Sequence, residues 1–216
     1  MDVHFSTIHS WIERYIPIIS QYVNSLKPEL SETWHADELF IRVKGSPHKG
    51  GQAGLAFLWN VMDRETRFLL ASKLSKDRDL LGSIMAFQEA IKNAHSQTPD
   101  KIHTDSLKAY GSGITLAFGK DAPEHVKNCG VKKVHANNNR IERLNGTLRE
   151  RVKVQRGWKS YETPIAEGQR IAYNFVKPHM ALDKKTPAQA AGIEIKGWEE
   201  LFTLAMYNKK ARVSAQ

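Results

Sequence analysis

Three acidic residues occupy positions that suit the binding of a divalent cation: Asp37, Asp105 and Glu142. Sixty-seven residues separate Asp37 from Asp105, and 36 separate Asp105 from Glu142. Carboxylates without cysteine or histidine partners favour hard, oxygen-preferring cations, Mg²⁺ or Mn²⁺ rather than zinc. The sequence shows no Ser-His or Cys-His arrangement of the kind that activates a protein nucleophile. These residue types therefore indicate metal-dependent chemistry rather than covalent catalysis by a side chain.

Each of the three also has an ordinary structural interpretation. Asp37 shares a face of a predicted strand with aliphatic residues at 39, 41 and 43, so it needs a partner or a metal unless it caps the strand edge. Asp105 closes another predicted strand, where α/β sheets bind ligands, but it can equally begin a turn. Glu142 lies on a basic helix and can pair with Arg149. Taken one at a time, Asp105 and Glu142 favour the structural interpretation.

Three neighbours of the two aspartates are expected to lie outside the site. Glu38 points away from Asp37 by strand alternation, and we expect it to be a solvated surface residue. We expect His35 and His103 to be structural, and to point to the strand faces opposite the acids. The predicted cation ligands are therefore carboxylates alone.

The elements expected around these residues follow an α/β order. Alternating apolar residues between turn residues predict five strands, at 34–44, 54–63, 67–75, 101–105 and 123–129. Apolar residues at helical spacing predict one helix that ends at about 94 and another that begins near 107. They also predict a helix at 138–154 and a mostly helical segment at 161–216. The second and third strands are close enough for an antiparallel hairpin. This order fits a ribonuclease H-like fold, with a five-stranded mixed sheet flanked by helices.

Two helices carry more detailed expectations. In residues 1–30, Ser6 is expected to cap a first helix, and Pro17 to interrupt it before a second helix at 18–26. Asp77 or Ser75 is expected to cap the helix after the third strand. In that helix the larger apolar residues recur at helical spacing, at 80, 84, 87 and 91.

Positive charge is concentrated in one segment. The 216-residue chain carries 32 Lys and Arg against 23 Asp and Glu, a net charge of +9. Residues 131–159 alone hold nine of these bases and two glutamates, a net charge of +7. Such a cluster favours a polyanionic partner, nucleic acid above all. The residues expected to bind DNA are Lys132, Lys133, Arg140, Arg143, Arg149, Lys153 and Arg156.

Other patterns exclude several classes of protein. No apolar run approaches the roughly 18 residues that span a bilayer. The polar, acid-containing N-terminus is unlike a secretory signal, and the single cysteine, Cys129, cannot form an internal disulfide. There is no phosphate-binding GxxxxGK[ST] loop, so we expect no nucleotide cofactor. The chain is therefore expected to be cytoplasmic, without a membrane partner.

Four motifs, in order, resemble the DDE transposases of bacterial and archaeal insertion sequences, relatives of the retroviral integrase core. They are WHADELFIRVKG (34–45), IHTDSLKAY (102–110), NNNRIERLNGTLRERVK (137–153) and YNFVKPHMALDKKTPAQAAGI (173–193). The resemblance implies that Asp37, Asp105 and Glu142 form the catalytic triad. It also implies that Arg149 contacts the DNA of the transposon end.

The resemblance further implies a two-metal reaction. Two Mg²⁺ or Mn²⁺ ions about 4 Å apart activate the attacking oxygen and stabilise the leaving one. Asp37 would bridge both ions, while Asp105 and Glu142 would each hold one. Water would first free a 3′-hydroxyl at the element's end, and that hydroxyl would then attack target DNA. The implied protein is prokaryotic and nucleoid-associated, and it acts on double-stranded DNA as a homo-oligomer.

The N-terminal HFSTIHSWIERY resembles the recognition helix of the helix-turn-helix that precedes this catalytic domain, without its supporting helices. We expect a truncated helix-turn-helix remnant at 1–30, a catalytic core at 31–193 and a C-terminal helix with a basic tail at 194–216. The predicted function is DNA cleavage and strand transfer. One alternative is a transposition-incompetent DNA-binding remnant that regulates or inhibits a full-length transposase, and another is a nuclease that cleaves without joining.

Overall fold

The computed structural model describes residues 3–44, 54–127, 138–155 and 157–214. Its contacts divide the chain into two compact units. One is continuous, Leu30–Glu162, and the other joins Met1–Glu29 to Thr163–Gln216. The division falls at 29 and 162, whereas the sequence suggested domain boundaries at 30 and 193. The domain boundaries at 30 and 193 stay a prediction.

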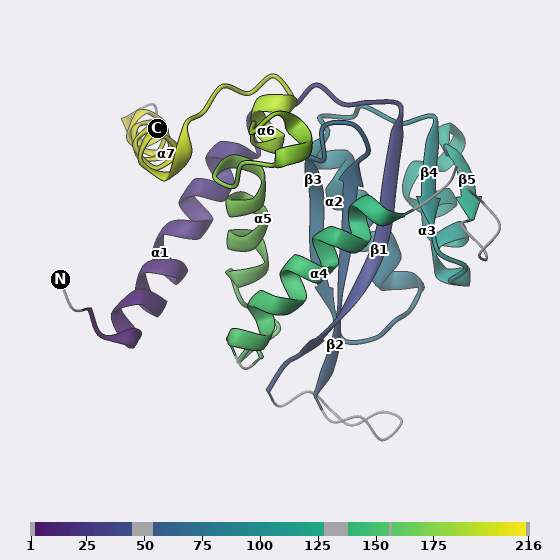
Figure 1. Ribbon diagram of the computed structural model, residues 1–216, viewed down its shortest axis with the longest axis horizontal. Helices are drawn as coiled ribbons and strands as arrows, with labels where there is room; N and C mark the ends of the chain where they lie inside the picture. Colours follow the sequence, from purple (N-terminus) through teal and green to yellow (C-terminus); the bar gives the residue numbers. More distant parts are fainter. Residues whose placement is uncertain (1–2, 45–53, 128–137, 156, 215–216) are drawn as a thin grey trace. The chain divides into compact units, whose positions relative to one another are not determined.

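The continuous unit is built on one mixed sheet (Figure 1). Its strands are β1 (Thr33–Arg42), β2 (Leu55–Asp63), β3 (Leu69–Ser75), β4 (Lys101–Thr104) and β5 (Glu124–Lys127). They lie in the order β3-β2-β1-β4-β5. The β1–β2 and β2–β3 pairs are antiparallel, while β1–β4 and β4–β5 are parallel. The predicted five-stranded ribonuclease H-like sheet is thereby confirmed.

Helices cover both faces of this sheet. They are α2 (Leu80–Asn93), α3 (Lys108–Phe118), the short η1 (Gly119–Asp121) and α4 (Asn139–Val154). Adjacent residues of β1 show which helix covers which face, because Asp37 bonds to Asn145 of α4 and Glu38 bonds to Tyr110 of α3. Successive strand residues point to opposite faces, so α4 lies opposite α3.

The α2 helix packs on the sheet through small residues, which corrects the expectation from its larger ones. The cap is Asp79 rather than Asp77 or Ser75, since its side chain accepts from the backbone N–H of Gly82 at 3.0 Å. Besides Phe87, the buried positions are small or polar, while Leu80 is exposed. A Cβ on Gly82 would lie 2.5 Å from Nε1 of Trp59. The helix thus comes closer to β2 than large side chains would allow.

The second unit consists of helices: α1 (Phe5–Val23), α5 (Ile165–Phe175), η2 (Met180–Leu182), α6 (Pro187–Ala190) and α7 (Gly197–Ser214). Pro17 does not interrupt α1, so the prediction of two helices was wrong. Its ring removes one backbone hydrogen bond, but burial of Ile16 and Ile19 on either side holds the helix together. The N-cap is His4 instead of Ser6. Throughout the described parts of the chain, no helix has both the length and the apolar character needed to cross a membrane.

Candidate metal centre

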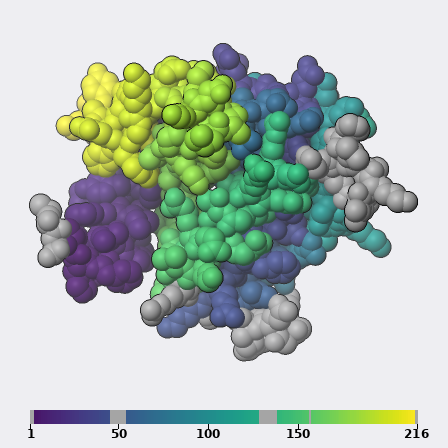
Figure 2. All heavy atoms as spheres, viewed as in Figure 1, coloured from purple at the N-terminus to yellow at the C-terminus, as the bar shows by residue number. Residues whose placement is uncertain are grey.

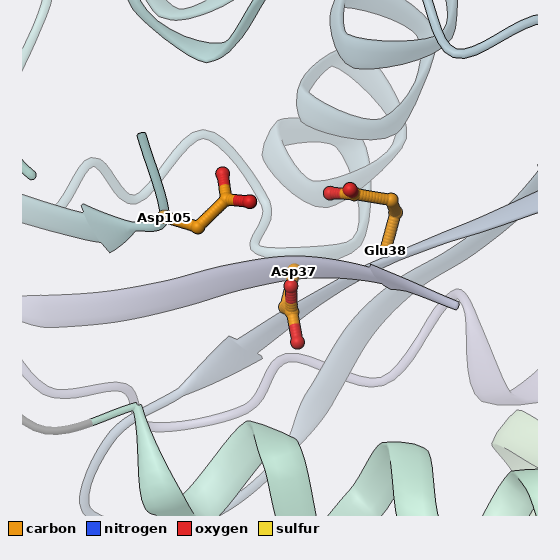
Figure 3. Close-up of side chains that lie close together, drawn as sticks. All are labelled: Asp37, Glu38 and Asp105. Atoms are coloured by element: carbon orange, nitrogen blue, oxygen red, sulfur yellow. The ribbon is translucent and has the colours of Figure 1, made fainter. Parts of the chain in front are cut away.

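Two of the three predicted acids meet where β1 and β4 run side by side (Figure 3). The strands are parallel, with His35 opposite His103. Asp37 and Asp105 each follow two residues later, so the register brings both acids to the same level, where β4 ends. One carboxylate oxygen from each of Asp37, Glu38 and Asp105 lies within 4.8 Å of the other two. Three oxygen donors at this spacing suit a hard divalent cation.

Asp37 is held from the α4 side. Its Oδ2 accepts a hydrogen bond from Nδ2 of Asn145 at 2.8 Å. Burial raises the pKa of Asp37 to about 7, and the negative charges of Glu38 and Asp105 add to the rise. The hydrogen bonds from Asn145 and from the Glu38 backbone act in the opposite direction. The surroundings of Asp37 therefore disfavour its charged form, and a bound cation would favour that form.

Glu38 is buried, so the expectation of a solvated residue was wrong. It does point away from Asp37, but α3 covers the face to which it points. Its Oε2 accepts from the Tyr110 hydroxyl at 2.6 Å, and Nε of Arg78 donates to its Oε1 at 2.5 Å. A buried carboxylate requires such partners. The negative charge of Glu38 in turn helps burial to raise the pKa of Tyr110 well above its ordinary value.

Asp105 begins a turn, as one of its two interpretations predicted, and its other oxygen faces Arg78. Its Oδ1 accepts from the backbone N–H of Leu107 at 2.8 Å, which stabilises the turn into α3. Its Oδ2 lies 3.3 Å from Nη2 of Arg78. The side chain is 41% exposed. The turn fixes one oxygen and leaves the other directed to the cluster.

His35 shares the strand face of Asp37, which corrects its expected orientation. The two residues are two apart in β1, and both side chains lie toward α4, through Asn138 and Asn145. The rings of His35 and His103 stack with centroids 5.1 Å apart, and Nδ1 of His35 lies 2.8 Å from Oδ1 of Asn138. Burial lowers the pKa of His35 to about 4. A neutral, stacked His35 fits the expected structural role.

Asn145 is a site residue that the sequence analysis missed. Its Oδ1 accepts from Nδ2 of Asn60 at 2.8 Å, and Oδ1 of Asn60 accepts from the Ser72 hydroxyl at 2.8 Å. These hydrogen bonds direct the amide nitrogen of Asn145 to Asp37. The available signal was its position three residues after Glu142, on nearly the same side of the helix.

Glu142 itself does not join the carboxylate cluster. It is exposed in the first turn of α4, one turn before Asn145. Its predicted role as the third metal ligand stays a prediction. The described residues thus bring together Asp37 and Asp105, and they add Glu38, Arg78 and Asn145.

The predicted DNA-binding residues fall into three groups. Lys132, Lys133 and Arg156 lie outside the described residues. Arg143, Arg149 and Lys153 are exposed on α4, which lies at the surface seen in Figure 2. Arg140 makes contacts within its own unit, since it donates a hydrogen bond to the Arg64 carbonyl and lies 3.2 Å from Glu65. Within the described ranges Arg149 forms no salt bridge, although pairing with Glu142 was the structural alternative.

Solved structures with a similar fold include retroviral proteins. A chain of the simian T-cell lymphotropic virus intasome, in complex with the PP2A regulatory subunit B56 gamma, aligns with a TM-score of 0.56 and 20% identity. That alignment covers 78% of this chain and 57% of the other. The catalytic core domain of BIV integrase aligns with a TM-score of 0.52 and 13% identity, over 74% of this chain and 93% of the core. These similarities support the ribonuclease H-like fold.

Similar sequences include transposases of Staphylococcus aureus. The transposase of the insertion sequence-like element IS431mec (strain Mu50) is 28% identical over 121 residues, which is 55% of this chain and 49% of that protein. The transposase of IS257 in transposon Tn4003 matches with the same identity and coverage. The chain thus spans about half the length of these relatives. The family model DDE_Tnp_IS240, a DDE domain, matches residues 31–175, a stretch that includes Asp37, Asp105 and Glu142. The chain therefore belongs to the DDE_Tnp_IS240 family of transposase domains.

Proposed function

We propose that this chain catalyses metal-dependent cleavage of DNA at the ends of an insertion sequence and transfers the freed 3′ end to target DNA. The observation that supports this most directly is that Asp37, within β1, lies close to Asp105, directly after β4. Burial, helped by the charges of Glu38 and Asp105, raises the pKa of Asp37, and a bound cation would act against both causes. The donors are oxygens, which fit Mg²⁺ or Mn²⁺.

In this proposal Asp37 and Asp105 hold the divalent cation, and Glu142 completes the ligand set from α4. Two ions in such a site would polarise the scissile phosphate and stabilise the attacking and leaving oxygens. The protein's own contribution is placement. The parallel register of β1 and β4 aligns the aspartates, Asn145 orients Asp37, and the turn at Leu107 orients Asp105.

The α4 helix would place DNA near the same carboxylates. Arg143, Arg149 and Lys153 are exposed on the helix that also carries Asn145 and Glu142. Lysine and arginine neutralise phosphates and position the duplex without reading its sequence. One helix would therefore contribute both to the metal centre and to the DNA contact. We also propose, on the family resemblance, that the chain acts as a homo-oligomer on DNA.

The test compares cleavage and binding on one end-containing duplex. Asp37→Ala, Asp105→Ala and Glu142→Gln are each expected to abolish Mg²⁺-dependent cleavage and strand transfer. DNA affinity without metal should be kept or improved, because each change removes a negative charge facing phosphate. Glu150→Gln is the matched control, since Glu150 is exposed on the same helix and plays no part in the proposed site.

Each outcome distinguishes between the functions considered. Cleavage that survives one of the three changes removes that residue from the metal centre. Cleavage without joining by the unchanged protein would favour a nuclease. Binding of the duplex without any cleavage would favour the regulatory remnant.

A further inference from the structure

Arg78 lies against the acidic cluster, although neither the family resemblance nor the sequence pattern drew attention to it. It belongs to the segment between β3 and α2, directly before the capping residue Asp79. Its Nε donates to Oε1 of Glu38 at 2.5 Å, and its Nη2 contacts Glu38 as well. The same Nη2 lies 3.3 Å from Oδ2 of Asp105. A single guanidinium therefore bridges two of the three clustered carboxylates.

The two halves of this bridge differ in strength. The Glu38 side chain is 2% exposed and accepts from both Nε and Nη2 of Arg78. The Asp105 side chain is 41% exposed and receives one longer contact. Leaving Glu38 without Arg78 would leave a buried charge unpaired, which is costly. Asp105 has water and the Leu107 N–H as other partners, so its release costs little.

The contacts of Glu38 also indicate that it is not one of the proposed cation ligands. Tyr110 donates to one of its oxygens and Arg78 to the other. Both oxygens are therefore used within the protein. Asp105, by contrast, has one oxygen fixed by the turn, and among the described residues its other oxygen contacts Arg78. That second oxygen is the one a cation between Asp37 and Asp105 would need.

We propose that Arg78 is an exchangeable counter-ion of the metal centre, a positioning residue that holds Asp105 until a divalent cation replaces it there. On binding of the cation, the guanidinium releases Asp105 and keeps Glu38. The inference rests on the proposed function in one respect, namely that Asp37 and Asp105 hold the cation. Before the cation arrives, Arg78 limits the repulsion among the three carboxylates, and this is the reason the cluster can be packed together without metal.

The exchange has a measurable cost for metal binding. The cation must displace a positive charge from one of its ligands and then lie near that charge. Removal of Arg78 should therefore tighten metal binding, by about three- to tenfold for a unit charge at this range in a partly solvated site. A purely structural role for Arg78 predicts the opposite, because a loosened site binds metal more weakly.

The experiment measures Mn²⁺ affinity of the full chain without DNA, by calorimetry or by electron paramagnetic resonance of the free ion. Arg78→Gln is compared with wild type and with Lys73→Gln. The control removes an equal charge from the same unit, since Lys73 pairs with Glu89 at 2.9 Å and not with a carboxylate of the cluster. Asp105→Asn shows whether the measured binding belongs to the proposed site.

Arg78→Gln is expected to bind Mn²⁺ at least threefold more tightly than wild type, as the charge argument requires, with Lys73→Gln unchanged. Unchanged or weaker binding by Arg78→Gln, at a site that Asp105→Asn abolishes, overturns the exchange. Equal binding by wild type and Asp105→Asn instead refutes the proposed metal centre. Should Arg78→Gln fail to fold, Arg78→Lys keeps the charge beside Glu38 but lacks the fork that reaches both acids. It should bind Mn²⁺ more tightly than wild type, and equal or weaker binding also overturns the exchange.

Discussion

Replacing Asp37 by asparagine should stabilise the metal-free protein while it removes metal binding. Burial and two neighbouring acids oppose the ionisation of the Asp37 carboxyl group. Asparagine has nearly the same shape and can still accept the hydrogen bond from Asn145. The change therefore removes an unfavourable charge and leaves the packing in place. Stability and function thus impose opposite demands at this residue.

The magnitude follows from the pKa of Asp37, which is raised from 3.8 to about 7. A rise of one unit corresponds to about 1.4 kcal/mol, so ionising Asp37 in the folded protein costs at most on the order of 4 kcal/mol. Relaxation of the cluster and screening by water reduce this to about 2 kcal/mol. For a chain of this length, about 2 kcal/mol corresponds to a rise in Tm of roughly 4–8 °C.

The sign depends on pH in a defined way. Because the folded-state pKa is the higher one, the folded protein binds the proton more tightly than the unfolded chain does. The wild type pays no such penalty below the unfolded pKa of about 3.8, and loses stability as pH rises through the folded value of about 7. The advantage of Asp37→Asn should accordingly begin above pH 3.8, be partial at pH 5 and be full at pH 8.

The assay is thermal unfolding at pH 5 and pH 8, with and without Mg²⁺, followed by circular dichroism. Mg²⁺ should raise the Tm of wild type at pH 8 and leave Asp37→Asn unchanged. Asp121→Asn serves as control, since Asp121 is an exposed residue of η1 in the same unit. The reasoning is refuted if Asp37→Asn is less stable than wild type at pH 8, or if its advantage does not grow with pH.

Two further predictions concern α4 and the packing of α2. Arg149→Ala and Lys153→Ala should each reduce by about one the slope of log K for DNA binding against log salt, because phosphate contacts release counterions. Tm should stay unchanged, because both side chains are exposed. A falling Tm with an unchanged slope would show a structural role instead. Gly82→Ala should cost about 1–3 kcal/mol of unfolding free energy through overpacking against Trp59, whereas Gly146→Ala, with nothing within 4 Å of the new Cβ, should stabilise α4 by about 0.5–1 kcal/mol. Denaturant unfolding of both glycine variants tests the contrast, and equal effects would contradict it.

The sheet could be predicted from the sequence because its evidence is local. Alternation along β1 and turn residues between strands are properties of a few neighbouring residues. The ribonuclease H-like order of the elements was likewise enough to place Asp37, within the first predicted strand, near Asp105, at the end of the fourth. Pro17 shows the limit of the local rule. Its effect on the helix depends on the burial of Ile16 and Ile19, and the sequence alone does not show what they pack against.

The error about Glu38 has a different origin. Alternation correctly placed it on the face opposite Asp37, but alternation does not say what covers that face. The partners that allow its burial are distant in sequence, Tyr110 by 72 residues and Arg78 by 40. The same holds for Asn145, which lies 108 residues from Asp37. A charged residue flanked by apolar ones is compatible with both outcomes until such partners are known.

The adjacent pair Asp37 and Glu38 gives β1 a particular position in this site. Because successive side chains point to opposite faces, one acid is held by α4 through Asn145 and the other by α3 and the β3–α2 segment through Tyr110 and Arg78. The helices on the two faces of the sheet therefore both bind carboxylates of one dipeptide, Asp37–Glu38. A shift in α4 on binding DNA would act on Asp37 directly, whereas the arrival of a cation would act on Arg78 through Asp105. Both events change the charge balance of the same three carboxylates, which gives metal and DNA a physical route by which each can influence the binding of the other.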